Sequence, residues 1–335
     1  MSQISIPSRA PGEIPHDDTV VPFEVAALDV RGRTVRLGPM VDEILSRHAY
    51  PTAVSRLLGE AIVLTVLLGS SLKFEGRFIL QTQTDGPVRM LVVDWRSPGK
   101  VRAYAQFDAD AVAALTGTTD GDLLGRGHLA MTIDQGADMN RYQGLVALGG
   151  GTLEEAAHEY FLRSEQIPTR VRLAVAEEFS AAAGGGGAQR RWRAGGLMLQ
   201  FLPKSQERQR VADLHPGDAP EGTAPHVVPE DDAWVEGQAL VATVEDVELL
   251  DPALSTERLL FRLFHEHGVR VFRAVDVEAQ CSCSHARVET ILKSFPAADR
   301  AAMVENGRIG VTCEFCNTRY EFDPASVVGP EDAEG

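Results

Sequence analysis

Cys281-Ser-Cys283 and Cys313-Glu-Phe-Cys316 decide how the last sixth of this chain folds, because they hold all four of its cysteines. Twenty-nine residues separate the two pairs. Four thiolates in two close pairs match a tetrahedral site for a soft metal, and zinc is the usual occupant. The pattern predicts a small four-cysteine zinc module at residues 281–325. Residues 308–312 and 318–322 should form a hairpin with the second pair in its turn.

The spacing of the first pair leaves two interpretations of this module open. Zinc ribbons usually carry two C-x-x-C pairs, whereas Cys281 and Cys283 form C-x-C. Closely spaced thiols can also oxidise to disulfides, which removes metal ligands. The residues alone therefore fit a permanently closed structural zinc and a zinc-loaded redox switch.

Composition describes a soluble globular protein with room for two domains. Of the 335 residues, 44% are hydrophobic and 24% are charged. The longest apolar run, residues 61–68, is much shorter than the roughly 20 residues that cross a bilayer, so we expect no membrane partner. The N-terminus has no basic region followed by an apolar core, so we expect a cytoplasmic protein.

The charge balance argues against a nucleic-acid partner. The chain has 32 basic and 48 acidic side chains, which gives a net charge of −16 and repels polyanions. Arg190-Arg-Trp-Arg193 is the one basic cluster that could override this, and we expect it to be a solvated strand end.

Residues 20–205 carry the patterns of an α+β domain with antiparallel sheets and packed helices. Residues 21–37 alternate, and Arg31-Gly32 predicts the turn of a hairpin. Thr152-Leu-Glu-Glu155 is a capping box that opens a helix ending before Pro168. The other expected elements are a helix at 52–73, strands at 78–84, 88–94, 101–107, 128–134 and 142–148, and strands at 171–178 and 191–202 joined by the glycine-rich residues 181–187.

Residues 206–280 differ in composition and are expected to be an acidic linker with helices. Residues 211–257 contain twelve acids and no lysine or arginine. Residues 234–250 suit an amphipathic helix, and the apolar side chains of residues 259–264 would cover most of a helix circumference. Self-repelling charge beside apolar surface favours local unfolding. The alternative is a solvated connector between domains with one docked helix.

Several phrases together carry a resemblance to a known family. They are Thr84-Asp-Gly-Pro-Val88, Gly127-His-Leu-Ala-Met-Thr-Ile-Asp134, Tyr160-Phe-Leu-Arg-Ser-Glu-Gln-Ile-Pro168, Ala194-Gly-Gly-Leu-Met-Leu-Gln200, Leu263-Phe-His-Glu-His-Gly-Val-Arg-Val-Phe272, Cys281-Ser-Cys-Ser-His-Ala-Arg-Val-Glu289 and Val311-Thr-Cys-Glu-Phe-Cys-Asn317. Over nearly its whole length the chain resembles the 33-kDa heat-shock proteins, the redox-regulated holdase chaperones of bacteria.

The resemblance implies a mechanism. The reduced protein would hold one Zn²⁺ through Cys281, Cys283, Cys313 and Cys316 and be inactive as a chaperone. Oxidation in stress would form the disulfides Cys281–Cys283 and Cys313–Cys316 and release the zinc. The linker would then unfold, and the protein would bind unfolding client proteins as a homodimer, without ATP.

Two functions of other classes compete with this interpretation. One is a zinc-ribbon interaction protein with a permanent structural zinc. The other is an enzyme whose site lies within residues 21–205 and uses residues such as Glu165 or Asp134. No P-loop, G-x-S-x-G or H-E-x-x-H motif is present, so we expect no enzyme.

Overall fold

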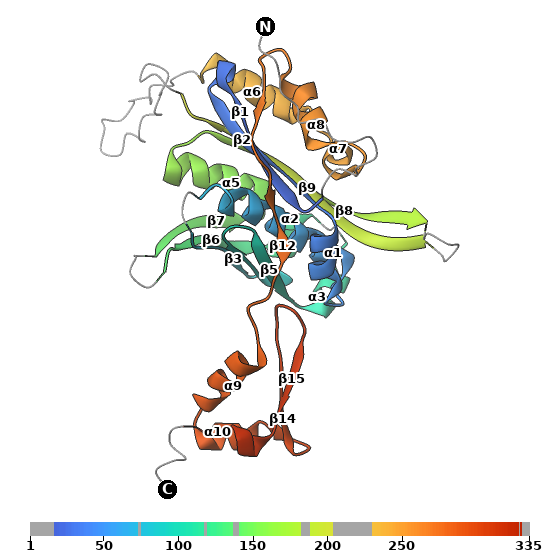
Figure 1. Ribbon diagram of the computed structural model, residues 1–335, viewed down its shortest axis with the longest axis vertical. Coiled ribbons are helices and arrows are strands. Elements are labelled where there is room, and N and C mark those ends of the chain that lie inside the picture. Colours follow the sequence, from blue (N-terminus) through green and yellow to red (C-terminus); the bar gives the residue numbers. More distant parts are fainter. Residues whose placement is uncertain are drawn as a thin grey trace.

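Two six-stranded sheets enclose the apolar helix α2 (Thr52–Gly69), which contacts strands of both (Figure 1). The computed structural model describes residues 17–72, 75–116, 119–136, 141–181, 188–203, 230–327 and 329. α2 is long and apolar enough to cross a membrane by composition, but most of it is buried between the sheets. The helix therefore forms the centre of the core, and the expected α+β architecture is confirmed.

Sheet A lies on the linker side of α2. Its strand order is β10-β1-β2-β9-β8, and β11 also pairs with β1. The bounds are β1 (Thr19–Val25), β2 (Val30–Leu37), β8 (Thr169–Ala181), β9 (Ala188–Phe201), β10 (Arg270–Val271) and β11 (Val275–Asp276). Helix α1 (Pro39–Ser46) packs beside α2, and α5 (Leu153–Tyr160) continues as a π-helical turn, Phe161–Glu165. The capping box predicted at Thr152 is present.

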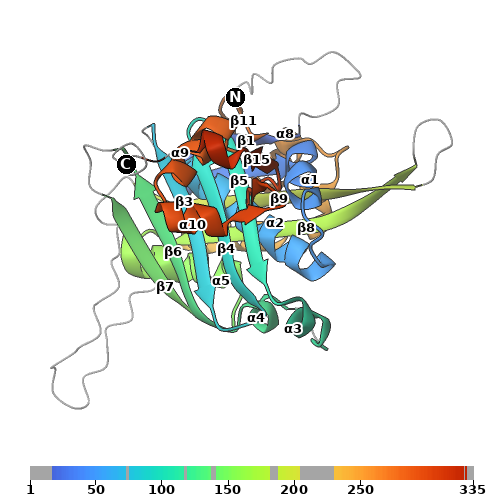
Figure 2. The ribbon, with the colours of Figure 1, turned by 90° about the horizontal axis from the view of Figure 1, so that it is seen from below.

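Sheet B lies on the opposite side of α2, in the order β12-β5-β4-β3-β6-β7. Its strands are β3 (Arg77–Thr84), β4 (Val88–Arg96), β5 (Lys100–Phe107), β6 (Arg126–Asp134), β7 (Tyr142–Gly149) and β12 (Glu278–Ala279). Two short helices, α3 (Ala109–Ala113) and α4 (Asp120–Leu124), lie between β5 and β6. Seen from below, the cysteine module lies in front of this sheet (Figure 2).

The first hairpin turns at a different place from the one predicted. The chain reverses in a short 3-10 helix, Ala26–Leu28, followed by Asp29 in the left-handed region at φ 51°. Gly32 instead lies inside β2 opposite Phe23. A Cβ on Gly32 would lie 2.2 Å from the Phe23 ring, so this glycine makes room for an aromatic side chain. The prediction of a turn at Arg31-Gly32 was wrong, because close packing selects the same residue as a turn does.

Three helices of the acidic segment cover the outer face of sheet A. They are α6 (Asp232–Ala242), α7 (Asp246–Leu250) and α8 (Thr256–Phe264). Phe264 of α8 packs on Phe23, with ring centroids 5.7 Å apart, and Trp234 of α6 packs on Phe201 at 6.0 Å. Leu259, Leu260, Leu263 and Phe264 are buried while Phe261 is exposed, so α8 is apolar on one face rather than around most of its circumference. The glycine run 184–187 and residues 206–229 lie outside the described residues.

Arginines of sheet A hold helix α7. The side chain of Arg36, which is only 2% exposed, donates hydrogen bonds to the carbonyls of Asp251 at 2.7 Å and Glu248 at 2.6 Å. Arg172 pairs with Asp246 at 2.9 Å. Where α7 crosses β9, a Cβ on Gly195 would lie 2.4 Å from the Leu249 carbonyl oxygen, so only glycine fits. The carbonyls that end α7 are thus satisfied by cationic side chains.

Arg193 belongs to the same group. The prediction of a solvated strand end holds for Arg190 and Arg191, which are exposed near the start of β9, and is wrong for Arg193. Arg193 is 8% exposed and lies within β9. Its Nε donates to the Leu250 carbonyl at 2.9 Å, and its two terminal nitrogens bind the carboxylate of Asp17 at 2.8 and 2.7 Å. Through its bond to the Leu250 carbonyl, Arg193 helps hold the acidic segment on sheet A.

Replacing Arg36 with methionine should loosen α7 without unfolding the core. The substitution keeps most of the side-chain volume but removes the Arg36 donor from the Glu248 carbonyl and one of two donors from the Asp251 carbonyl, at a cost of about 1–3 kcal/mol. Hydrogen–deuterium exchange should accelerate at residues 246–251. Arg31→Met on the same strand is the control, because Arg31 is exposed. Equal exchange in both variants would show that Arg36 does not hold the helix.

Candidate metal centre

Two separate backbone elements bring the cysteines together. Cys281 and Cys283 follow strand β12, and helix α9 (His285–Lys293) begins directly after them. Cys313 and Cys316 lie in the turn between β14 (Arg308–Thr312) and β15 (Arg319–Phe322). The turn is closed by hydrogen bonds from the Cys313 amide to the Thr318 carbonyl and from the Asn317 amide to the Cys313 carbonyl, at 2.9 and 2.8 Å. The hairpin predicted around the second pair is confirmed.

The rest of the module is small. Helix α10 (Ala297–Ala302) and strand β13 (Val304–Glu305) complete it, and β13, β14 and β15 form a three-stranded sheet. Its buried apolar cluster consists of Leu292, Ile309, Phe322 and Val327. Such a core is too small to supply much stability by itself, so a bound metal would contribute to folding.

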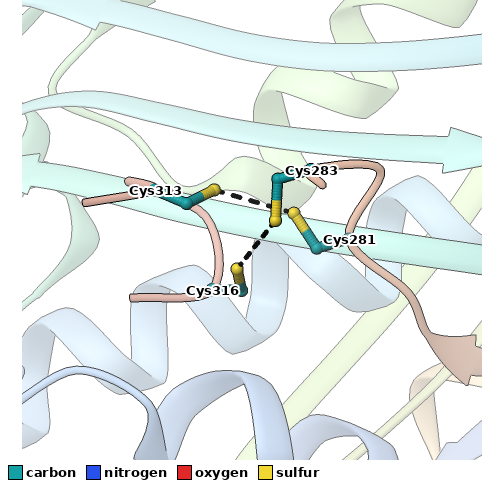
Figure 3. Close-up of side chains that lie close together, drawn as sticks. All are labelled: Cys281, Cys283, Cys313 and Cys316. Carbon is teal, nitrogen blue, oxygen red and sulfur yellow. Dashed lines mark hydrogen bonds between the residues drawn. The ribbon is translucent and has the colours of Figure 1, made fainter. Parts of the chain in front are cut away.

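The four sulfurs form one cluster that can hold a metal ion. All four Sγ atoms lie within 4.8 Å of one another (Figure 3). Two of the separations join a sulfur of one pair to a sulfur of the other: Cys281 to Cys313 at 3.7 Å and Cys283 to Cys316 at 3.2 Å. The structure thus brings together every cysteine that the sequence singled out.

The cluster fits a tetrahedral thiolate site. With Zn–S bonds of about 2.3 Å, the sulfurs of a regular tetrahedron are about 3.8 Å apart. The separation of Cys281 and Cys313 matches this edge, and that of Cys283 and Cys316 is about half an ångström shorter. All four side chains are half-buried, and the donor set is entirely sulfur. Soft thiolate donors in this number suit Zn²⁺ better than Mg²⁺ or Ca²⁺.

The metal-free thiols differ in acidity. Burial raises the pKa of Cys283 to about 12, although a hydrogen bond from Tyr320 opposes the shift. Burial also raises the pKa of Cys313. Burial acts in the same direction on Cys316, but hydrogen bonds from the Thr318 hydroxyl and amide outweigh it and leave the pKa at about 6. At neutral pH the metal-free cluster therefore holds a thiolate beside protonated thiols.

Two polar neighbours of the sulfurs had no role in the sequence analysis. The Tyr320 hydroxyl donates a hydrogen bond to Cys283 Sγ at 3.2 Å, and the Thr318 hydroxyl lies 3.2 Å from Cys316 Sγ. Thr318 stands two residues after Cys316, and Tyr320 stands four residues after it. Side chains alternate along a strand, so residues two apart point to the same face. This spacing is the sequence signal that could have identified both residues as neighbours of the sulfurs.

His285, which follows the first cysteine pair, does not belong to the sulfur cluster: its ring packs on Phe322, with centroids 4.3 Å apart. The two residues named as possible catalytic groups also have structural surroundings. Glu165 accepts a hydrogen bond from the Tyr160 hydroxyl at 2.6 Å. Asp134, at the end of β6, lies 3.5 Å from Arg141. Each of the two carboxylates has a partner of its own, and neither contact indicates a catalytic site.

Comparisons with known proteins agree with one another. Residues 18–323 match the family model described as Hsp33 protein. The 33 kDa chaperonin of Caulobacter vibrioides is 46% identical over 316 residues, covering 92% of this chain and 95% of its own. The 33 kDa chaperonin of Pseudomonas fluorescens strain SBW25 is 35% identical, covering 94% of each. The crystal structure of the 33 kDa chaperonin from Thermotoga maritima superposes with a TM-score of 0.69 at 20% identity, covering 92% of this chain and 96% of its own, and shows the same fold.

The affinity of the reduced cluster for zinc should fall as the pH is lowered. Because the metal-free pKa values of Cys283 and Cys313 are raised, both thiols are protonated at pH 7–8, and zinc must displace those protons. Each displaced proton makes the affinity rise about tenfold per pH unit. We expect at least about a hundredfold between pH 7 and pH 8, measured by competition with a chelator. Calorimetry in two buffers of different ionisation enthalpy counts the protons released; a pH-independent affinity would contradict the assignment.

Proposed function

Because the chain belongs to the Hsp33 family, we propose that it is a redox-regulated, ATP-independent chaperone of the cytoplasm. One observation supports this above all others. The four cysteines of the chain form a cluster that can hold a metal ion, and the outer apolar face of sheet A is covered by the acidic helical segment that precedes them. A cluster whose chemistry changes with oxidation is thus joined through residues 270–280 to the helices that cover sheet A.

In the reduced state, Cys281, Cys283, Cys313 and Cys316 would hold one Zn²⁺. When bound, the ion keeps the sulfurs as thiolates and adds its binding free energy to the folding of the module. Tyr320 and Thr318 would stabilise the negative charge on Cys283 and Cys316 through their hydroxyl groups.

Oxidation would convert each close pair into a disulfide. The two thiolates of one pair lose two electrons and form an S–S bond, while hypochlorite takes up those two electrons and two protons to give chloride and water. The proposed disulfides are Cys281–Cys283 and Cys313–Cys316. A disulfide is a poor zinc ligand, so either bond removes half of the donors, and the module loses the stability that the metal supplied.

Loss of the module would release the segment that covers sheet A. Residues 270–280 connect helix α8 with Cys281, and their strands β10, β11 and β12 have only two residues each. Freed helices would expose apolar side chains of sheet A and of the linker itself, including Phe23, Phe201 and Phe264. These surfaces suit unfolding clients, and we propose that the active form is a homodimer.

A light-scattering assay tests this function. A heat-unfolding client is mixed with the protein, either reduced and zinc-loaded or treated with hypochlorite, and released zinc is followed with a chromogenic chelator. We expect suppression of scattering only after oxidation, with about one zinc released per chain. Retained zinc with no suppression in either state would support the alternative, an interaction protein with a permanent structural zinc.

The Cys313→Ser variant should lose tight zinc binding and leave the linker partly open without oxidant. Loss of a hydrogen-bond partner of a metal ligand alone costs about 10- to 100-fold in metal affinity, so loss of the ligand itself should cost more than about a hundredfold. Zinc competition measures the affinity, and proteolysis within residues 230–280 reports the open linker. Ser282→Ala is the control, because it changes the same loop region without removing a sulfur. One tight zinc per chain in Cys313→Ser would contradict the ligand assignment.

A further inference from the structure

The outward face of strand β5 is polar and aromatic. Val101, Ala103 and Ala105 point into the core and are buried. The alternate side chains, Lys100, Arg102 and Tyr104, are half-buried on the other face. This is the side of sheet B in front of which the cysteine module lies in Figure 2.

The arm that carries Cys281 is bound along β5. Strand β12 pairs with it in parallel, with Glu278 opposite Lys100 and Ala279 opposite Val101. The Glu278 amide donates to the Gly99 carbonyl, and the Gln280 amide donates to the Val101 carbonyl, both at 2.8 Å. Cys281 is the next residue, so the last hydrogen bond to β5 lies one residue before it.

The arm that carries Cys313 and Cys316 is bound to the same strand through Phe315. The guanidinium carbon of Arg102 lies 4.1 Å from the centroid of the Phe315 ring, a close cation–π contact. The Tyr104 ring lies 6.2 Å from the same ring. Next to the turn, the Asn317 side chain donates to the Arg47 carbonyl at 2.9 Å. Phe315 stands between two of the cysteines, so these contacts act directly on the turn.

Arg102 is itself held in place. Its Nε and one terminal nitrogen contact the same Oδ of Asp94, at 2.8 and 2.7 Å. Asp94 is only 7% exposed and is also bound by Arg77 at 2.7 Å. A buried carboxylate between two guanidinium groups therefore orients the cation on which Phe315 packs.

We propose that β5 is a docking platform that positions both cysteine arms, with Arg102 and Phe315 as positioning residues for the sulfur cluster. The proposal rests on the proposed function only in assigning zinc to that cluster. The small core of the module cannot by itself fix two arms that are 29 residues apart in sequence. Because the arms share one strand, loss of either contact should loosen the other.

Zinc transfer from the reduced, zinc-loaded full-length protein to a chelator tests the platform. Arg102→Met keeps the aliphatic stem and removes the cation, and Phe315→Ala removes the ring. We expect each variant to release zinc about three- to thirtyfold faster, the range for a cation–π contact of this kind. The double variant should be no faster than the faster single variant, because both side chains make one contact. Ile291→Ala in α9 is the control, since Ile291 is 51% exposed.

Hydrogen–deuterium exchange at Gln280 provides a readout that does not require metal. In both variants this amide should exchange faster, although it lies on the other arm. Unchanged zinc release and unchanged Gln280 exchange would overturn the platform. Wild-type protein that binds no zinc would overturn the metal assignment instead. In that case, faster Gln280 exchange in Phe315→Ala supports the platform, and unchanged exchange overturns it.

Discussion

The backbone hydrogen bonds of residues 270–280 connect the three parts of this molecule. β10 and β11 extend sheet A beside β1, and β12 extends sheet B beside β5. The linker helices precede this segment and the first cysteine follows it. Each of the three strands has two residues, whereas the strands they join have seven or eight. Short peripheral strands open at lower free energy than the sheet they border, so the connection between cysteines and linker is also its least stable part.

Charge explains how the acidic segment is held on sheet A, and it bears on the proposed opening. Residues 211–257 contain no lysine or arginine, and α7 is contacted by Arg36, Arg172 and Arg193 of sheet A. Arg262 of α8 also pairs with Glu248, at 2.7 Å. Burying a guanidinium costs solvation free energy, which hydrogen bonds to carbonyls and carboxylates only partly offset. The arginines therefore specify where α7 docks more than they add net stability. Once the helix leaves, water solvates both partners, which lowers the cost of opening.

The sequence was sufficient wherever one local pattern had one physical meaning. The period of α2, the capping box at Thr152 and the turn between Cys313 and Cys316 are of this kind. It failed where tertiary contacts decide. Glycine is common in turns, but Gly32 lies in a strand and makes room for Phe23. Arginine is common at exposed strand ends, but Arg193 binds Asp17. Nothing local in Phe315 indicated that it docks on Arg102, because that partner lies more than 200 residues away.

The order of elements along the chain sets the order in which a change at the cysteines would reach the linker helices. From Cys281 backwards, the elements are β12 on sheet B, β11 and β10 on sheet A, and then α8. A disturbance of the cysteine arms meets β12 first, and α8 is held in turn by the burial of Phe264 and its neighbours. In the proposed mechanism the linker would therefore open from the cysteine end, where the strands have two residues each and Val277 is the buried apolar side chain. The apolar contacts with Phe23 and Phe201 would then be the last to be lost, after the preceding strands have separated. This arrangement keeps the apolar face covered during small fluctuations of the module.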